Sequence, residues 1–220
     1  MRCAQALEKP RCVCMKMDEN RAHQPRVVYD RLASRYDTAL RPLERWFLKR
    51  LRARTLASLP AHACLLEVGA GTGLNFPHYP HGAHGAASEQ SLEMLRRARE
   101  KQRPESVHLI QSCAEALPFP ENHFDGALAT LVFCSVASPA LAFAELRRVV
   151  KPGGTVSLLE HVRPRGPLGP LFDLLNVFTV ALFDDHFNRR TSLEAERAGL
   201  HLLSVEAHAF GIIQLIVCRV

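Results

Sequence analysis

The fold of this chain is decided by the stretch Cys64-Leu65-Leu66-Glu67-Val68-Gly69-Ala70-Gly71-Thr72-Gly73. Its first five residues are mostly apolar and form a run of strand length, which predicts a short buried strand. The three glycines that follow allow unusual backbone torsions and let a ligand approach the main chain closely. In open α/β sheets, ligands bind outside the carboxyl ends of the strands. The stretch therefore predicts a ligand-binding loop at the end of a first strand.

The spacing of these glycines excludes two common nucleotide-binding loops. A dinucleotide fingerprint requires G-x-G-x-x-G, and counting from Gly69 the last position is Leu74. The sequence also contains no G-x-x-x-x-G-K-[ST] motif, which a nucleoside triphosphate loop would need. The loop therefore serves a different ligand.

Strand-like runs alternate with helical patterns downstream of the loop. Ser138-Pro139 predicts a helix start, and Thr191-x-x-Glu194 reads as a capping box that opens a helix closed by Gly199. Such alternation predicts a parallel sheet with helices on both faces. The last two runs have a short connection, which suits an antiparallel hairpin. The expected strand-like runs lie at 64–68, 107–110, 125–134, 155–160, 202–205 and 212–218.

Composition and charge indicate a globular protein with a basic leading arm. The chain has 220 residues, of which 47% are hydrophobic, and its formal net charge is +6. Residues 1–54 contain 14 Lys or Arg and 6 Asp or Glu, whereas residues 55–220 contain 14 and 16. We therefore expect three parts: a basic, disordered tail over 1–25, a helical cap over 26–60 and a ligand-binding domain over 61–220. Translation starts at Met1 or, alternatively, at Met17.

Five motifs, in family order, resemble the class I S-adenosylmethionine-dependent methyltransferases. The glycine stretch 67–73 resembles the family's motif I, and Glu89 stands where the family has an acid after its second strand. Segment 114–120 resembles the part beside the adenine, and 147–154 resembles a late helix-stop motif. Segment 29–37 resembles the helical lid of the ubiquinone/menaquinone C-methyltransferase-like branch.

This resemblance implies a fold, a cofactor and a set of binding residues. The fold would be a Rossmann-like, doubly wound, mostly parallel seven-stranded sheet with a C-terminal antiparallel hairpin and an N-terminal helical cap. The cofactor would be S-adenosyl-L-methionine, with Glu89 on the ribose, Glu67 ordering the loop or meeting the methionine amine, and Tyr36 covering the cofactor. The implied cofactor-binding residues are Tyr36, Glu67, Gly69, Gly71, Gly73, Glu89, Gln90, Cys113, Ala114, Glu115 and Thr130.

One departure from the family pattern concerns the adenine. Cys113 stands where the family often has an aspartate that faces the adenine amine. A thiol is a poor hydrogen-bond acceptor. Adenine recognition is therefore expected to depend more on the backbone at Ala114.

The methyl acceptor is less well specified by the sequence. Segments 130–136, 160–162 and 182–184 resemble thiol-methylating methyltransferase-like proteins of animals and small bacterial phospholipid N-methyltransferases. The resemblance implies a small apolar, thiol or lipid-headgroup acceptor, with His161 and Asp185 as candidate catalytic residues. A histidine of ordinary pKa suits a general base, and a structural hydrogen-bonding role for His161 is the alternative. Open alternatives are a non-catalytic cofactor-binding module, a quinone-precursor methyltransferase and an RNA methyltransferase.

Partners and location follow from apolar segments and cysteines. No apolar stretch reaches the ~18 residues of a membrane span, and the seven cysteines do not suggest a disulfide framework. We expect a cytoplasmic protein with no metal and no nucleic-acid partner. Trp46 and Phe47 lie in the Arg-rich segment 41–54. That segment is either an amphipathic helix packed on the sheet or a peripheral membrane contact, and the oligomeric state is left open.

Overall fold

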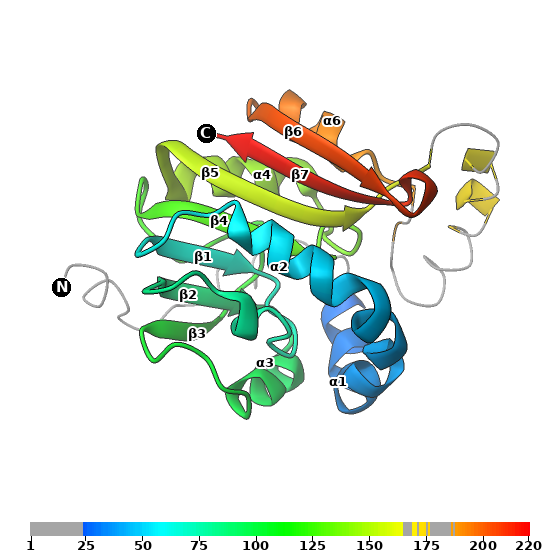
Figure 1. The fold of residues 1–220 in the computed structure, drawn as a ribbon, viewed down its shortest axis with the longest axis horizontal. Coiled ribbons are helices and arrows are strands. Elements are labelled where there is room, and N and C mark those ends of the chain that lie inside the picture. Colours follow the sequence, from blue (N-terminus) through cyan, green and yellow to red (C-terminus); the bar gives the residue numbers. More distant parts are fainter. Residues whose placement is uncertain (1–23, 165–168, 171, 175, 177–185, 187) are drawn as a thin grey trace.

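The computed structural model describes residues 24–164, 169–170, 172–174, 176, 186 and 188–220, and its centre is a seven-stranded sheet (Figure 1). The strand order is β3-β2-β1-β4-β5-β7-β6. The first five strands pair in parallel, and β7 runs antiparallel to both β5 and β6. The predicted mostly parallel sheet with a C-terminal hairpin is therefore confirmed. The strands are β1 (Cys64–Val68), β2 (His84–Glu89), β3 (Val107–Gln111), β4 (Phe124–Thr130), β5 (Val150–His161), β6 (His201–His208) and β7 (Ile213–Arg219).

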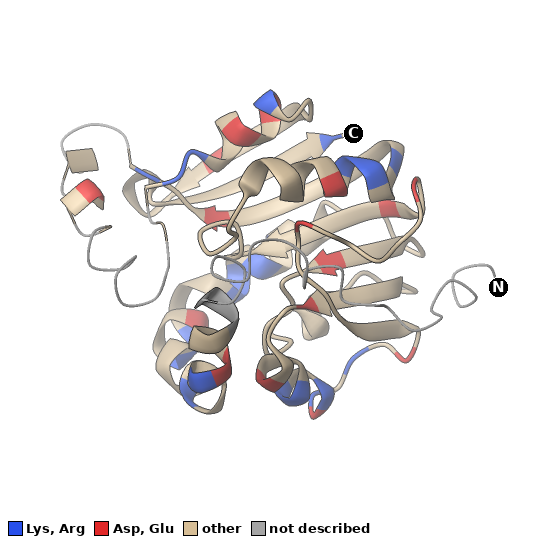
Figure 2. Ribbon diagram, turned by 180° about the vertical axis from the view of Figure 1, so that it is seen from behind, with Lys and Arg blue, Asp and Glu red and all other residues tan. Residues whose placement is uncertain are grey.

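Helices cover both faces of the sheet. The helices are α1 (Gln24–Leu43), α2 (Lys49–Ala57), α3 (Leu92–Arg99), α4 (Pro139–Val149) and α6 (Thr191–Arg197). Helix α2 crosses the face seen in Figure 1, whereas α4 and α6 lie on the opposite face, which Figure 2 shows from behind. Helix α1 extends past the carboxyl ends of β1 and β2 and contacts α3. The chain passes from β1 to β2 on one side and returns to β4 on the other, so the topological switch lies between β1 and β4.

The core follows the alternation of side chains along the strands. Leu66 packs with the cluster beneath α4, whereas Leu65 packs with Leu56 and Leu128 on the face covered by α2. All five residues of β1 are buried. Burial on both faces explains why this run is mostly apolar, with Glu67 as the exception, rather than alternating between apolar and polar residues.

The cap is one long helical segment with an irregular turn. Pro42 lies inside α1, and the five residues Glu44–Leu48 (η3) form a π-helical segment before α2 begins. Proline has no N–H to donate to the preceding turn, which gives a local reason for the helix to lose its regular spacing here. The helices of the expected cap thus cover residues 24–57, close to the predicted span.

Several local predictions can be compared with the structure. Ser91 caps α3 by accepting a hydrogen bond from the Met94 N–H at 3.1 Å. The capping box at Thr191 is wrong, because Arg190 holds the N-cap position and Thr191 is buried inside the first turn. The strand expected over 125–134 ends at Thr130, because Leu131 turns the chain with φ of 58°.

The cysteines do not all behave as the sequence suggested. Cys64, Cys134 and Cys218 are buried, reduced thiols. Cys113 is disulfide-bonded, and nothing in its spacing indicated this pairing. Within the described part of the chain, no group of three or more His, Cys, Asp or Glu side chains could hold a metal ion, and no helix is long and apolar enough to cross a membrane.

Candidate active site

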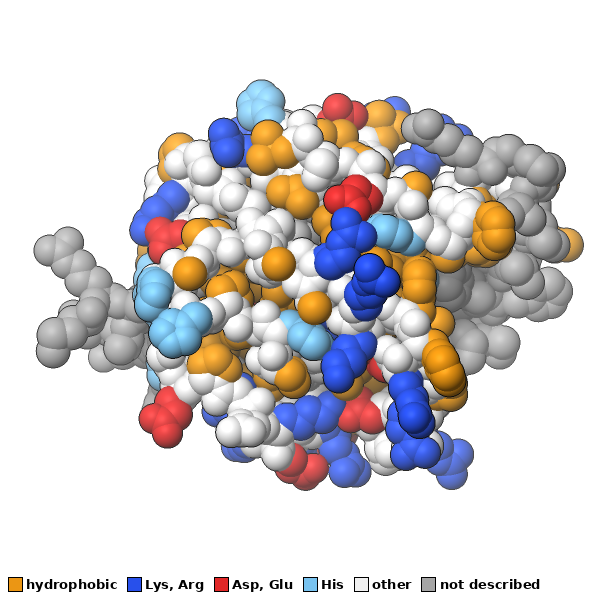
Figure 3. All heavy atoms as spheres, in the orientation of Figure 1, with side chains coloured by type: hydrophobic (Ala, Val, Ile, Leu, Met, Phe, Trp, Pro, Cys, Tyr) orange, Lys and Arg blue, Asp and Glu red, His pale blue; other side chains and the backbone are white. Residues whose placement is uncertain are grey.

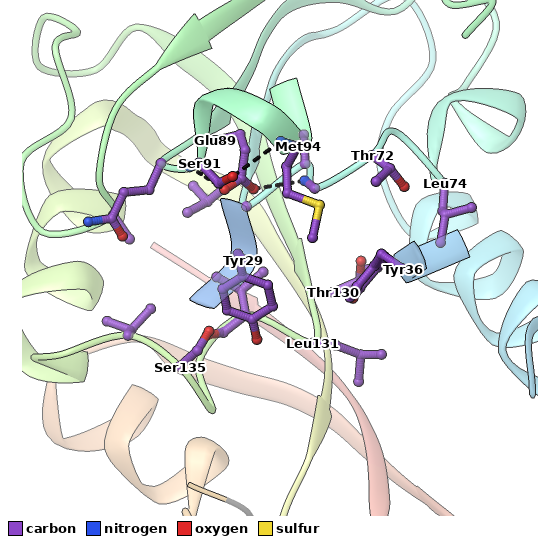
Figure 4. Close-up of a pocket in the computed structure, with 18 of the residues that line it drawn as sticks. Tyr29, Tyr36, Thr72, Leu74, Glu89, Ser91, Met94, Thr130, Leu131 and Ser135 are labelled. Carbon is purple, nitrogen blue, oxygen red and sulfur yellow. Dashed lines mark hydrogen bonds between the residues drawn. The ribbon is translucent and has the colours of Figure 1, made fainter. Parts of the chain in front are cut away.

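A cleft opens at the carboxyl ends of β1 and β4, under α1 (Figure 4). The space in the cleft and at its open mouth, solvent included, is about 810 Å³. Its position is the topological switch of the sheet, where ligands bind in this class of fold. The described residues that line it come from the cap, the glycine loop and the ends of β2 and β4: Tyr29, Tyr36, Arg52, Val68, Gly69, Ala70, Gly71, Thr72, Leu74, Glu89, Gln90, Ser91, Met94, Ser112, Ala114, Glu115, Thr130, Leu131, Val132, Ser135 and Val136.

The three glycines of the loop have different structural roles. Gly69 and Gly71 line the cleft with φ of 67° and 55°. A Cβ atom at Gly69 would lie 2.4 Å from Val132 Cγ2, whereas one at Gly71 would meet nothing within 4 Å. Gly73 does not line the cleft, and its missing Cβ leaves room for the ring of Phe76. Gly69 therefore lets the loop pack against Val132 in the turn after β4, and Gly71 presents bare backbone to the open space.

Glu89 ends β2 with its carboxylate at the cleft. Its Oε2 accepts a hydrogen bond from the Gly71 N–H and its Oε1 accepts one from the Ser91 N–H, both at 2.8 Å (Figure 4). Burial raises the pKa of Glu89, and the two N–H groups lower it in part. Each oxygen keeps a second lone pair, so the fixed carboxylate is suited to accept hydrogen bonds from a vicinal diol such as a ribose.

A buried polar network lies behind the glycine loop and centres on Glu67, which is 1% exposed. Its carboxylate accepts hydrogen bonds from Asn75 Nδ2 at 2.6 Å and from the Tyr79 hydroxyl. Burial raises the pKa of Glu67, and these two donors with the nearby Arg52 charge lower it in part. Glu67 is absent from the lining of the cleft, so its present contacts order the loop from beneath.

Arg52 joins the cap to this network, and the sequence analysis did not single it out. The side chain is 4% exposed and lines the cleft. Its NH1 donates to Asn75 Oδ1 at 3.1 Å and to Thr130 Oγ1 at 2.6 Å, while Nε donates to Glu44 Oε1 at 2.8 Å. One cation therefore ties α2 to Asn75, just after the glycine loop, and to Thr130 at the end of β4. The available signal was its helical spacing with Leu51, Thr55 and Leu56, which are also buried.

Helix α1 is fastened over the cleft at two points. Asp30 accepts hydrogen bonds from Ser91 Oγ at 2.5 Å and from the Glu93 N–H at 3.2 Å. About two turns further along the helix, Asp37 accepts a hydrogen bond from Thr72 Oγ1 at 2.5 Å and pairs with Lys101 at 2.6 Å. These contacts join α1 to the start of α3 and to the glycine loop.

Next to each of these two aspartates, α1 presents a tyrosine to the cleft. Tyr29 and Tyr36 enter it from the helix (Figure 4). Their rings meet edge to face, with centroids 6.4 Å apart. The two tyrosines lie one above the other on α1 because they are seven residues apart.

Only some of the residues implied near the adenine line the cleft. Gln90, Ala114 and Glu115 line the cleft, whereas Cys113 is 3% exposed and does not. Glu115 Oε1 accepts a hydrogen bond from the Ser138 N–H at 3.2 Å. A role for the Cys113 thiol at the adenine therefore has no support in the geometry, and the backbone at Ala114 lies at the cleft as expected.

The two candidate catalytic residues are not among the described lining residues. His161 ends β5, where it pairs with Ile213 of β7, and it lies outside the cleft lining. Asp185 lies outside the residues that the structure describes. The neighbouring Glu160 is fully buried and accepts hydrogen bonds from the Val132 and Phe133 N–H groups at 3.0 and 3.2 Å. Glu160 therefore orders the turn after β4.

Known proteins share this fold and part of this sequence. The sequence profile of the family described as "Methyltransferase domain" matches residues 66–158. A solved SAM-dependent methyltransferase from Thermotoga maritima matches with a TM-score of 0.68 and 21% identity, over 89% of this chain and 99% of that chain. The fold is thus that of the class I S-adenosylmethionine-dependent methyltransferases.

Two curated methyltransferases are also similar to this chain in sequence. A protein of Cereibacter sphaeroides named phosphatidylethanolamine N-methyltransferase is 37% identical over 53% of this chain, which spans 61% of that relative's length. A protein of Syntrophotalea carbinolica named ubiquinone/menaquinone biosynthesis C-methyltransferase is 31% identical over 70% of this chain and 68% of its own length. The chain belongs to the S-adenosylmethionine-dependent methyltransferases, whose cofactor is S-adenosylmethionine.

Proposed function

We propose that this chain methylates a small acceptor with an apolar body, whose reacting atom is an amine of a lipid headgroup or a thiol. The cofactor, when bound, supplies a methyl group on a sulfonium. The observation that carries the proposal is the wall of the cleft. It combines a diol-accepting carboxylate, Glu89, with an aromatic and aliphatic surface formed by Tyr29, Tyr36, Met94 and Leu131.

The charged side chains that line the cleft support an acceptor whose own atom is nucleophilic without a catalytic base. Among the described lining residues, the charged side chains are Arg52, Glu89 and Glu115, and each already makes hydrogen bonds to the protein. An uncharged amine or a thiolate attacks with its own lone pair, and a thiol ionises with slight activation. A carbon acceptor needs an activating base within hydrogen-bond reach. His161 and Asp185 stay predictions for such a base.

The cap residues would position the acceptor and exclude water. Methyl transfer is an in-line displacement, so its rate depends on holding the two reacting groups in alignment. Tyr29 and Tyr36 would cover the cleft from α1, and Arg52 would fix the end of β4 through Thr130. The relative named phosphatidylethanolamine N-methyltransferase supports a lipid amine. The relative named ubiquinone/menaquinone biosynthesis C-methyltransferase makes a quinone precursor the second candidate.

An acceptor panel with radiolabelled S-adenosylmethionine tests the proposal. The panel contains vesicles with phosphatidylethanolamine, alkyl thiols, quinone precursors and tRNA, with the chain and its Glu89→Ala variant in parallel. Label transferred to the lipid amine or to a thiol, and lost with Glu89→Ala, is the expected result. Transfer to a quinone precursor or to tRNA alone would contradict the acceptor class. Binding of S-adenosylhomocysteine without transfer to any acceptor would favour a non-catalytic module.

A further inference from the structure

An exposed basic and apolar patch lies on the outer side of the cap. We define the Trp46 patch as the exposed residues Arg41, Leu43, Arg45, Trp46, Lys49 and Arg50. Trp46 is 84% exposed and Leu43 is 49% exposed, although both belong to residue types that are usually buried or half-buried. Trp46 and Leu43 are close together along the helix, and neighbouring exposed apolar side chains of this kind indicate an interaction site.

The charge around Trp46 has one sign. Within the described part of the chain, Arg41, Arg45, Lys49 and Arg50 form no salt bridge, whereas the neighbouring Arg52 and Arg54 each pair with a glutamate. The nearest acid in the sequence, Glu44, is 15% exposed and turned toward Arg52. The patch therefore offers four cations to a partner without a carboxylate of its own to repel an anionic one.

The spacing of these residues brings them to one side of the helix. Trp46 lies three residues after Leu43 and three and four residues before Lys49 and Arg50, and this spacing makes the three residues its neighbours on the helical segment. In Figure 3, basic side chains gather over α2 and α1 with hydrophobic side chains among them. The other side of this cap carries Tyr36 and Arg52, which line the cleft. A partner held by the patch would thus lie against the outer side of the element that covers the active site.

We propose that the Trp46 patch docks the protein on an anionic lipid surface. Tryptophan is enriched at membrane interfaces, where its ring lies at the level of the headgroups. Basic clusters bind anionic leaflets, and each Lys or Arg near the surface strengthens binding by about fivefold. The patch combines an exposed tryptophan and leucine with four basic side chains that form no salt bridge with the described residues. This composition is typical of a surface that binds at a membrane interface. Nucleic acid is the less fitting partner, because the body of residues 55–220 carries two more acids than bases.

The chain provides its own probe, because Trp46 is its single tryptophan. The experiment uses the full chain with vesicles of phosphatidylcholine containing phosphatidylserine, and with vesicles of phosphatidylcholine alone. We expect tryptophan emission to shift to the blue and to become protected from an aqueous quencher with the anionic vesicles only. Co-sedimentation with those vesicles without any change in tryptophan emission would overturn the proposal, because binding would then occur elsewhere on the chain.

Two charge-matched variants measured by co-sedimentation separate the patch from general attraction. Arg45→Gln with Lys49→Gln removes two patch cations and should weaken binding to anionic vesicles by about 25-fold. Arg197→Gln with Arg219→Gln removes two exposed cations from α6 and β7 and should leave most of the binding. Equal losses in the two variants would overturn the proposal. A tryptophan response to an RNA oligonucleotide and not to vesicles would overturn it as well.

Discussion

The Glu44–Arg52 pair permits a quantitative test of how the cap is held to the sheet. Arg52→Met removes a guanidinium that is 4% exposed and donates to three different side chains. Breaking a buried ion pair by removing one partner costs about 3–5 kcal/mol. Asn75 and Thr130 keep their mutual hydrogen bond of 2.9 Å, and Glu44 can reach water. The expected loss in the free energy of unfolding is therefore about 3 kcal/mol, at the lower end.

A double-mutant cycle separates the ion pair from the rest of the Arg52 contacts. Glu44→Gln alone removes the counter-charge of Arg52 but keeps an acceptor oxygen, so it should cost about 2 kcal/mol, the size of one hydrogen bond to a charged group. In the double variant neither charge is stranded, so the combined loss should be smaller than the sum of the single losses by at least about 1.5 kcal/mol. Urea unfolding of the full chain and the three variants at one pH measures these values. Single losses that add to within about 0.5 kcal/mol would refute the reasoning, because they would mean that the two residues do not interact.

Three further predictions concern the loop, the ribose carboxylate and the lid. Gly69→Ala should lower the free energy of unfolding by at least about 1 kcal/mol more than Gly71→Ala, because only the new methyl at Gly69 meets a side chain; equal losses in urea unfolding would contradict this. Gly71→Ala should instead weaken S-adenosylhomocysteine binding in calorimetry. Burial raises the pKa of Glu89, so the native state holds the proton more tightly than the unfolded state, and stability relative to Glu89→Gln should fall as pH rises above 4.5; parallel pH profiles of the two proteins in urea unfolding would disprove it. Asp37→Asn removes the ion pair with Lys101 and should speed amide exchange in α1 by up to about fivefold in mass spectrometry; unchanged exchange would show that the pair does not fasten the helix.

Much of the fold follows from local sequence signals. The mostly apolar run 64–68 predicted a short buried strand, and all five of its residues are buried. The start of α3 has a typical local signal, because Ser91 stands at its N-cap and the serine hydroxyl accepts a hydrogen bond from an N–H of the first turn. Thr191 misled because its pattern is the same as that of a cap, but the side chain is buried inside the helix. Burial of a single threonine depends on packing from other elements, which the local pattern does not contain.

The sequence predicted the parts of the candidate site that depend on backbone conformation. It did not predict the parts that depend on side-chain packing between distant segments. The glycines and Glu89 could be found because positive φ angles and an acid after the second strand leave marks in the sequence. Arg52 could not be found with the same ease, because it lies among many arginines and only its contacts with Asn75 and Thr130 set it apart. Those contacts join residues 23 and 78 positions apart in the chain.

The π-helical segment Glu44–Leu48 determines the rotational phase of the cap. In an uninterrupted helix of 3.6 residues per turn, Tyr36 and Arg52 would point to nearly opposite sides, yet both line the same cleft. The π-helical segment after Pro42 has a wider turn than an α-helix and so changes the rotation between Tyr36 and Arg52. A single-residue deletion in the segment would turn everything beyond it by about 100°. Arg52 would then leave Thr130, while Tyr36 kept its place, so the length of this one turn sets the register between the two halves of the lid.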